Sequence, residues 1–411
     1  MGDLKYDLEA AELGFASDRL ERLGRHFAPY VDDGRLPGWL IVVARRGHVA
    51  HVESYGWRDR DARLPVTQDT IWRLASMTKP ITSVAALMLY EEGAFELKDP
   101  ISRWLPAFAD MGVYQSGSSL RPVTRRATEP IRVWHLLTHT AGLTYGFHYN
   151  HPVDALYRSA GFEWGYPPGI DLAACCDIWA DQPLLFEPGS EWNYSVASDV
   201  LGRLVEVISG MDLDQFLRSR ILDPLGMTDT GFWLSEDRVE RLAAPYTVNP
   251  AGAAHPAVLM PRPDARSRPS ALSGGGGLVG PAGDYLRFAE MLRRRGELDG
   301  VRLLSPRTVD YMTRNQLPGG ADLEQFGRPL FAETTFDGVG FGLGVSVVTD
   351  AARGKVLTSA GEYGWGGAFS TFFFVAPAEE LTVLLFTQLL PSSTHPIRSQ
   401  LKQLVYQSLV D

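Results

Sequence analysis

Alternation of apolar and polar residues predicts two pairs of strands, one near each end of the chain. Residues 38–56, GWLIVVARRGHVAHVESYG, are predicted to form two strands joined by a tight turn at Arg46-Gly47. Ala368 to Val375 and Leu381 to Thr387 form the second predicted pair, with a proline-containing turn between them. We therefore expect both ends of the chain to contribute to a β-sheet.

Helical spacing of apolar residues dominates the remaining sequence. It predicts an amphipathic helix around Ser17 to Asp32, a closing helix at about Pro396 to Leu409, and a mainly helical middle section from about residue 70 to 300. Strands at both ends with helices between them indicate an α+β protein in which a helical domain is inserted into a sheet domain. The predicted limits are 1–70 and 275–411 for the α/β sheet domain and 71–274 for the mainly helical domain.

Composition narrows the possible partners and compartment. The 411 residues are 45 % hydrophobic, enough for a large core, and the formal charge of −10 attracts neither nucleic acid nor an anionic membrane surface. We therefore expect no nucleic-acid and no membrane partner. Cys175 and Cys176 are adjacent, and sequence neighbours rarely meet the geometry of a disulfide, so a reducing compartment fits. The first residues, MGDLKYDLEAAELG, are polar and acidic, which adds to the prediction of a cytoplasmic location.

A serine and a lysine lie at the start of one predicted helix. The stretch WRLASMTKPITSVAALMLYEEG, residues 72–93, places Ser76 at or beside this start, and Gly93 ends the helix. Pro80 fits only in the first turn, where backbone N–H groups lack partners. Lys79 then lies one turn from Ser76, within reach of its hydroxyl. Such a serine can act as a nucleophile if a deprotonated lysine takes its proton, and the helix N-terminus favours the developing negative charge.

The Ser-x-x-Lys spacing alone is not specific to catalysis. Ser76 could instead cap the helix N-terminus. The same spacing recurs at Ser399 and Lys402, inside the closing helix, without supporting motifs. A second stretch favours the catalytic interpretation, because Tyr194 comes directly before a helix that Gly210 ends, a position from which a phenol can project into a cleft.

A third stretch supplies glycines beside a predicted strand. Trp365-Gly366-Gly367 is expected to lead a glycine-rich loop into the strand that begins at Ala368, giving an unhindered backbone edge for an acyl group. In this order, Ser76-Met77-Thr78-Lys79, Tyr194-Ser195-Val196 and Trp365-Gly366-Gly367 resemble the three motifs of the serine β-lactamase and penicillin-binding-protein superfamily. The likeness is greatest to class C β-lactamases and family VIII carboxylesterases. It extends over nearly the whole chain and includes LLTHTAGL at 136–143 and SGGGGLVGPAGDYLRFAEML at 273–292.

This resemblance implies a fold and a set of roles. The fold would be a mostly antiparallel sheet flanked by helices, with an inserted helical domain and the active site between the two. Ser76 would be the acylated nucleophile, and Lys79 and Tyr194 the base and proton shuttle, a coupled pair whose immediate base is left open. The backbone N–H groups of Ser76 and Ala368 would form the oxyanion hole, which agrees with a strand-edge and a helix-start N–H converging on one oxygen.

Two positions depart from the pattern of the β-lactamases and carboxypeptidases in this superfamily. Val196 stands where those enzymes have Asn, and Trp365 where they have Lys. Both changes remove polar recognition of a substrate's amide and carboxylate. Trp-Gly-Gly resembles instead the family VIII esterases and their acyltransferase relatives. The sequence has no Gly-x-Ser-x-Gly, so the nucleophile elbow of α/β-hydrolases is not an alternative.

The predicted function is a cofactor-independent serine carboxylesterase that cleaves small or medium carboxylic esters through an acyl-enzyme on Ser76. Acyl transfer to an alcohol is a variant of this reaction. The alternatives are a D-amino-acid peptidase or amidase, a β-lactamase-type hydrolase, and a binding or sensor protein that keeps the fold without turnover. The expected partner is a small-molecule ester, and the sequence does not fix the oligomeric state.

Aromatic residues are concentrated between residues 145 and 185. This concentration indicates that they form walls of an apolar pocket for an acyl or alcohol group. The predicted substrate contacts are Tyr145, Phe147, Trp365, Gly366 and Gly367.

Histidines and glycines outside these motifs have simpler explanations. His135 and His139 are four residues apart, as in a zinc helix, but the glutamate of that motif is missing, so we expect buried, hydrogen-bonded histidines and no metal. His148 and His151 are expected in a surface loop. Gly274 to Gly277 lacks a P-loop lysine and is expected to permit close backbone approach at the rim of the cleft.

Overall fold

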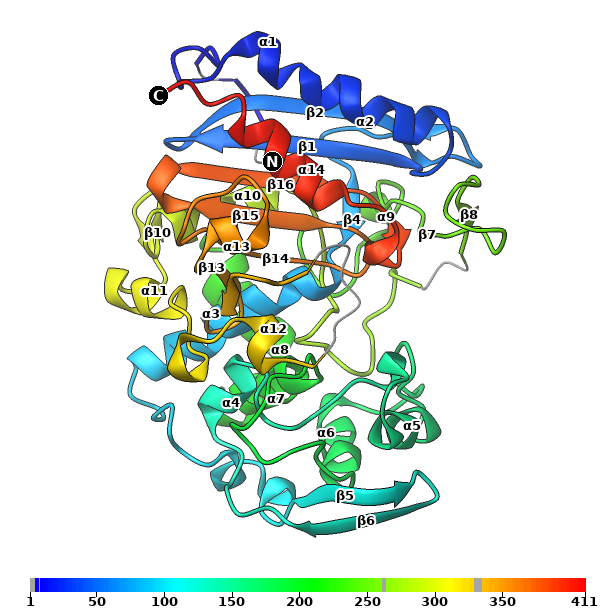
Figure 1. Cartoon of the computed structure of the whole chain (residues 1–411), viewed down its shortest axis with the longest axis vertical. Coiled ribbons are helices and arrows are strands. Elements are labelled where there is room, and N and C mark those ends of the chain that lie inside the picture. The colour runs from blue at the N-terminus through cyan, green and yellow to red at the C-terminus, as the bar shows by residue number, and fades with distance from the viewer. Residues whose placement is uncertain (1–3, 7, 261–263, 329–334) are drawn as a thin grey trace.

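Both ends of the chain build one antiparallel sheet (Figure 1). The computed structural model describes residues 4–6, 8–260, 264–328 and 335–411. Within these, the main sheet contains, in spatial order, β12 (Val339–Phe341), β13 (Ser346–Val348), β14 (Tyr363–Gly366), β15 (Phe372–Ala376), β16 (Leu381–Phe386), β1 (Gly38–Arg45), β2 (His48–Asp59) and β3 (Leu64–Pro65). The first hairpin joins the last one through β1 and β16, where Arg45 pairs with Leu381. The predicted α+β class and antiparallel sheet are confirmed.

The first hairpin turns where the sequence predicts. Arg46 and Gly47 both have positive φ, 55° and 89°, which a two-residue turn between twisted strands requires.

The second strand pair begins differently from its prediction. β15 starts at Phe372 rather than Ala368, because the residues before it form a turn in which the Gly367 N–H donates to the Thr371 carbonyl (2.8 Å) and Ser370 has a φ of 67°. The stretch containing Trp365, expected to be a glycine-rich loop, is strand β14, paired on both sides. Glycines carry no side chain, so they gave no alternating pattern from which this strand could be predicted.

Three helices cover one face of the sheet. They are α1 (Ser17–Leu20), α2 (Arg22–Asp32) and α14 (Ile397–Tyr406). The predicted first helix is thus broken at Glu21, and the closing helix ends three residues before the predicted Leu409. Phe27 of α2 and Leu401 of α14 are fully buried against Ile41 of β1, so the apolar faces predicted for these helices form this layer of the core.

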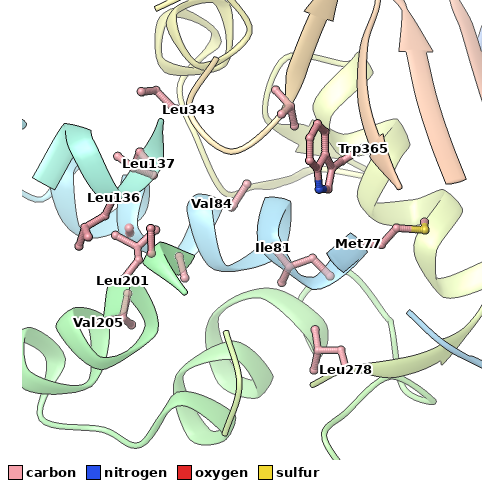
Figure 2. Packing of buried hydrophobic residues seen from close by; sticks show 14 of the residues in the cluster. Met77, Ile81, Val84, Leu136, Leu137, Leu201, Val205, Leu278, Leu343 and Trp365 are labelled. Atoms are coloured by element: carbon pink, nitrogen blue, oxygen red, sulfur yellow. The ribbon is translucent and has the colours of Figure 1, made fainter. Parts of the chain in front are cut away.

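The opposite face of the sheet packs on α10 (Ala282–Arg293) and on the largest apolar cluster of the molecule. Helix α3 (Thr78–Glu91) follows the 3₁₀ turn η1 (Ala75–Met77) and packs along α7 (Ala197–Ser209). Figure 2 shows Ile81 and Val84 of α3 in the cluster that also holds Leu201 of α7 and Trp365 of β14. The predicted helix after Ser76 therefore runs through the centre of the protein.

Shorter elements complete the described chain. The further helices are α4 (Val133–Leu137), α5 (Pro152–Ser159), α6 (Leu172–Ala180), α8 (Leu213–Leu217), α9 (Glu236–Val239), α11 (Pro306–Met312), α12 (Leu323–Phe326) and α13 (Ala351–Gly354). The small strand groups are β4 (Ile71–Arg73) with β9 (Val279–Pro281), β5 (Gly112–Ser118) with β6 (Arg121–Arg126), β10 (Glu297–Leu298) with β11 (Val301–Arg302), and β7 (Tyr246–Thr247) with β8 (Val258–Leu259) and β17 (Leu389–Leu390).

The middle of the chain is more varied than the helical pattern predicted. The β5–β6 hairpin lies at the end of the molecule away from the main sheet (Figure 1), and no sequence signal indicated it. The domain limits, 1–70 with 275–411 against 71–274, stay a prediction. Among the described helices, none combines the length and apolarity needed to cross a membrane.

Candidate active site

Ser76 lies in η1, immediately before α3, and a neighbouring turn fixes its backbone. The Thr371 hydroxyl donates to the Leu74 carbonyl (3.2 Å). A Cβ on Gly367 would collide with the Thr371 hydroxyl and with the Leu74 carbonyl oxygen, so only glycine fits there. Ala75 carries a positive φ of 47°, an uncommon conformation for a non-glycine residue. The turn after β14 is thereby pressed against the backbone that presents the serine.

Lys79 is 1 % exposed and points its ammonium nitrogen at three oxygens. Its Nζ lies 3.1 Å from the Ser76 Oγ, 3.0 Å from the Tyr145 hydroxyl and 2.7 Å from the Gly275 carbonyl oxygen. The contact with Ser76 is the one that the spacing of three residues predicts. The other two contacts hold the end of a long flexible side chain in one position beside the serine.

Tyr194 lies before α7 and completes the cluster. Its ring centroid is 4.4 Å from the Lys79 Nζ, and its hydroxyl oxygen accepts a hydrogen bond from the Trp365 indole Nε1 (3.1 Å). Ser76 and Tyr194 line the same cavity. The structure therefore brings Tyr194 and Trp365, both distant in sequence, to the pair formed by Ser76 and Lys79.

The cavity has a volume of about 1230 Å³, with the solvent at its mouth included. Its lining near the serine includes four of the predicted substrate contacts, Phe147, Trp365, Gly366 and Gly367, together with Ala368. Among the described residues, neither the Ser76 N–H nor the Ala368 N–H donates to a protein acceptor. Both are therefore available to an oxygen atom placed in the cavity.

Tyr145, the fifth predicted substrate contact, is outside the cavity lining. Its hydroxyl accepts from Lys79, and its ring stacks on Phe147 with centroids 4.5 Å apart. Burial, with the charge of Asp199 adding to it, raises the pKa of Tyr145 well above its usual value. The phenol therefore keeps its proton at neutral pH.

The glycine loop is bound to a residue of α7 that the sequence analysis did not single out. Asp199, 1 % exposed, accepts hydrogen bonds at Oδ1 from the Tyr166 hydroxyl (2.7 Å), the Ser273 hydroxyl (2.6 Å) and the Gly275 N–H (3.0 Å). A Cβ on Gly275 would collide with Asp199, so the close approach predicted for this loop is confirmed. Asp199 lies in the first turn of α7, where acidic residues are common, and so it gave no separate signal.

The histidines have structural partners. His135 and His139 are buried, the Nδ1 of His135 accepts the Arg132 N–H, and the Nδ1 of His139 lies 3.2 Å from the Ser195 hydroxyl, which confirms that both are buried and hydrogen-bonded. The prediction of a surface loop is wrong for His148, which is half-buried with its Nε2 2.6 Å from the Tyr194 carbonyl oxygen. Burial lowers the pKa values of His139 and His148. No group of three or more metal-ligand side chains occurs within the described ranges.

The second Ser-x-x-Lys spacing has no catalytic arrangement. The Ser399 hydroxyl donates to the Pro396 carbonyl (3.0 Å), and Lys402 pairs with the buried carboxylate of Glu362. Each side chain is bonded to another group, so the serine and the lysine of this spacing do not form a pair.

The chain is similar to known proteins along nearly its whole length. Residues 23–407 match the family model described as Beta-lactamase. Esterase EstB of Burkholderia gladioli is 34 % identical over 93 % of this chain and 92 % of its own, and monacolin J acid methylbutanoyltransferase of Aspergillus terreus is 30 % identical over 92 % of each. The solved structure of EstCE1, a hydrolase with promiscuous acyltransferase activity, has a TM-score of 0.80 and 28 % identity, covering 97 % of this chain and 99 % of that one.

Proposed function

Because this chain belongs to the beta-lactamase family, we propose that it is a serine carboxylesterase that cleaves carboxylic esters through an acyl-enzyme on Ser76. One observation carries the proposal: the buried Lys79 Nζ lies 3.1 Å from the Ser76 Oγ at the wall of a cavity that Tyr194 also lines. The similarity to an esterase along almost the full length of both chains supports the same reaction.

The proposed reaction has two steps. In the first, the Ser76 Oγ bonds to the ester carbonyl carbon while its proton passes to the pair formed by Lys79 and Tyr194. The N–H groups of Ser76 and Ala368 hold the negative oxygen, and the C–O bond to the alcohol then breaks as the pair returns the proton to it. In the second step water adds to the acyl carbon by the same path, which releases the acid and restores the serine.

Transfer of the acyl group to another alcohol is the proposed variant. It differs only in the molecule that attacks the acyl-enzyme, and relatives named as acyltransferases support it. Adding a primary alcohol to the assay would then yield a new ester at the expense of the acid.

The residues around the serine favour esters over amides and β-lactams. Val196, 3 % exposed at the start of α7, offers no amide group to a substrate, and the Trp365 indole N–H is directed to Tyr194. Comparing the rates on an ester and on its matching amide measures this preference.

Substitution of the nucleophile tests the proposal. Ser76→Ala is expected to lower kcat for p-nitrophenyl acetate by about 10⁴-fold or more, as in other serine hydrolases. A fluorophosphonate should label the wild type on the peptide that contains Ser76 and leave the peptide with Ser399 unmodified. Undiminished hydrolysis by Ser76→Ala, or a label on another residue, would refute the assignment.

We also propose a cytoplasmic location. Cys175 and Cys176 are both buried and unpaired, as in proteins of reducing compartments. Fractionation of cells that produce the protein would test this.

A further inference from the structure

The cavity continues well past the nucleophile, over the face of the sheet that α14 covers. Away from Ser76 its lining includes Gly364 on β14, Phe372 and Phe374 on β15, and Val348 on β13. Residues of α13 and of the segment after it form one side, and α14 forms the other. Figure 1 shows α13 and α14 on the same side of the sheet. We call this extension the α13–α14 groove.

The groove is long compared with a small acyl group. It runs along β14 from Gly366 to Glu362, just before that strand, and reaches Val348 on β13, which lies opposite Glu362. Four residues of a strand and one strand spacing at right angles to it together span roughly 14 Å. An acetyl or butyryl group attached to Ser76 would leave most of this length unfilled.

The floor of the groove is apolar, and its α13 side combines apolar residues with Asp350 and Thr358, which are hydrogen-bonded to the start of α13 and to Glu362. The rings of Phe372 and Phe374 have centroids 5.9 Å apart and form the floor. Ala351 in the first turn of α13 and Val356 just beyond that helix are half-buried at the side. Apolar walls of this kind favour a hydrocarbon chain as occupant.

The polar residues on the α14 side already have partners. Arg398 donates to the carbonyl oxygens of Gly367 (2.9 Å) and Thr371 (3.1 Å), and its Cζ lies 5.4 Å from the centroid of Phe372. The Lys402 Nζ lies 5.6 Å from the centroid of Phe374. Both cationic heads therefore lie over rings of the aromatic floor and are held there by their partners.

The far end of the groove is bounded by a satisfied carboxylate. Glu362 is 2 % exposed, pairs with Lys402, and accepts hydrogen bonds from the Tyr406 hydroxyl (2.7 Å) and the Thr358 hydroxyl (2.8 Å). A charged ligand group would have to replace these contacts, whereas an apolar chain leaves them intact.

We propose that the α13–α14 groove binds an unbranched acyl chain of about eight to twelve carbons, so that the physiological substrates are esters of medium to long aliphatic acids. The inference rests on the proposed esterase function. The acyl group stays attached to Ser76 between the two steps, whereas the alcohol must leave and water must enter. The groove ends at the ion pair of Lys402 and Glu362, so it suits the acyl group, which stays bound. The part of the cavity near Phe147 suits the alcohol and the water, which exchange.

Substitutions that fill the α13–α14 groove with a larger side chain test this proposal. With p-nitrophenyl esters from acetyl to dodecanoyl, wild-type kcat/KM should rise towards octanoyl and decanoyl. Ala351→Phe and Val356→Phe each place a ring in the groove, and each should lower kcat/KM for the decanoyl ester about tenfold while leaving the acetyl ester within about twofold. Leu357→Phe is the matched control, because Leu357 is 53 % exposed beside Val356 and lies outside the cavity lining.

A labelling experiment on the wild type gives a readout without turnover. Decyl fluorophosphonate should modify Ser76 at least about tenfold faster than ethyl fluorophosphonate, and Ala351→Phe should remove this difference. The proposal would be overturned if a groove-filling variant lost kcat/KM equally on the acetyl and decanoyl esters, or if both fluorophosphonates labelled the wild type at equal rates. It would also be overturned if a groove-filling variant changed selectivity only among acetates of long alcohols. If Ser76→Ala keeps its activity, the esterase proposal fails. If activity depends on Ser76 but ignores chain length, only the groove assignment fails.

Discussion

The indole N–H of Trp365 donates a hydrogen bond to the hydroxyl oxygen of Tyr194 across 3.1 Å. β-Lactamases and carboxypeptidases that resemble this chain usually have a lysine at the position of Trp365. A neutral N–H here directs a partial positive charge at the phenol oxygen without adding a full charge to the buried site. The hydrogen bond also fixes the position of the Tyr194 hydroxyl beside Lys79.

Replacing this donor should slow the reaction. Trp365→Phe keeps an aromatic ring but loses the N–H, so we expect kcat/KM to fall about tenfold because the Tyr194 hydroxyl is no longer held in place. Trp365→His, which keeps a ring N–H, should recover part of the loss. Wild-type kcat/KM in Trp365→Phe would contradict this role.

The hydroxyl of Tyr145 should matter for turnover more than for binding. It contacts Lys79 and is outside the cavity lining, so Tyr145→Phe should lower kcat about tenfold with little change in KM, because Lys79 loses one of its three anchors. Tyr157→Phe is the control, since Tyr157 is a buried tyrosine of α5 whose hydroxyl is not among the hydrogen-bond partners given for Lys79. A change confined to KM would show instead that Tyr145 meets the substrate.

The fit of Gly367 against Leu74 and Thr371 makes a steric prediction. Gly367→Ala should push the turn after β14 away from η1 and slow fluorophosphonate labelling of Ser76 about 100-fold, while the protein stays folded. Gly165→Ala is the matched control, because nothing lies within 4 Å of a Cβ there. Unchanged labelling in Gly367→Ala would mean that the turn does not position the serine.

Stability should fall in acid, in part because of His135. Burial, with the charge of Arg132 adding to it, lowers the pKa of His135 from 6.5 to about 3, and its Nδ1 accepts the Arg132 N–H (2.9 Å). Between these two pKa values the unfolded chain binds a proton that the folded protein does not, so the stability present above pH 6.5 is lost as the pH falls. At pH 5 the low pKa of His135 should lower the free energy of unfolding by about 2 kcal/mol.

Urea unfolding at pH 7.5 and pH 5 measures this cost. His135→Asn keeps an acceptor for the Arg132 N–H but does not titrate, so its stability should fall less between the two pH values than that of the wild type, by about 2 kcal/mol. Other histidines titrate equally in both proteins and cancel in the comparison. Identical losses would exclude His135 as a source.

The elements that could be predicted were those with local signals. The contact between Ser76 and Lys79 follows from helical spacing, and the turn at Arg46-Gly47 from residue type. The meeting of Tyr194 with Trp365 is set by the sheet and α7 together, and only the family resemblance indicated it before the structure.

The elements that sequence analysis missed are set by tertiary contacts. β14 has two glycines in its four residues and carries no alternating pattern, so its strand conformation depends on pairing with β13 and β15. Tyr145 was grouped with the aromatic walls because nothing local shows that its hydroxyl turns to Lys79. Asp199 was missed because its partners come from loops distant in sequence.

The pairing of β1 with β16 has a consequence for the order of events on the ribosome. β16 follows β1 at a long distance in sequence, so one edge of β1 lacks its native neighbour until β16 has been synthesised. The β14–β15 turn that braces the nucleophile is translated shortly before β16. Enzymatic competence should therefore arise only after β16 has emerged, and the nascent chain is a natural client for chaperones that shield unpaired strands.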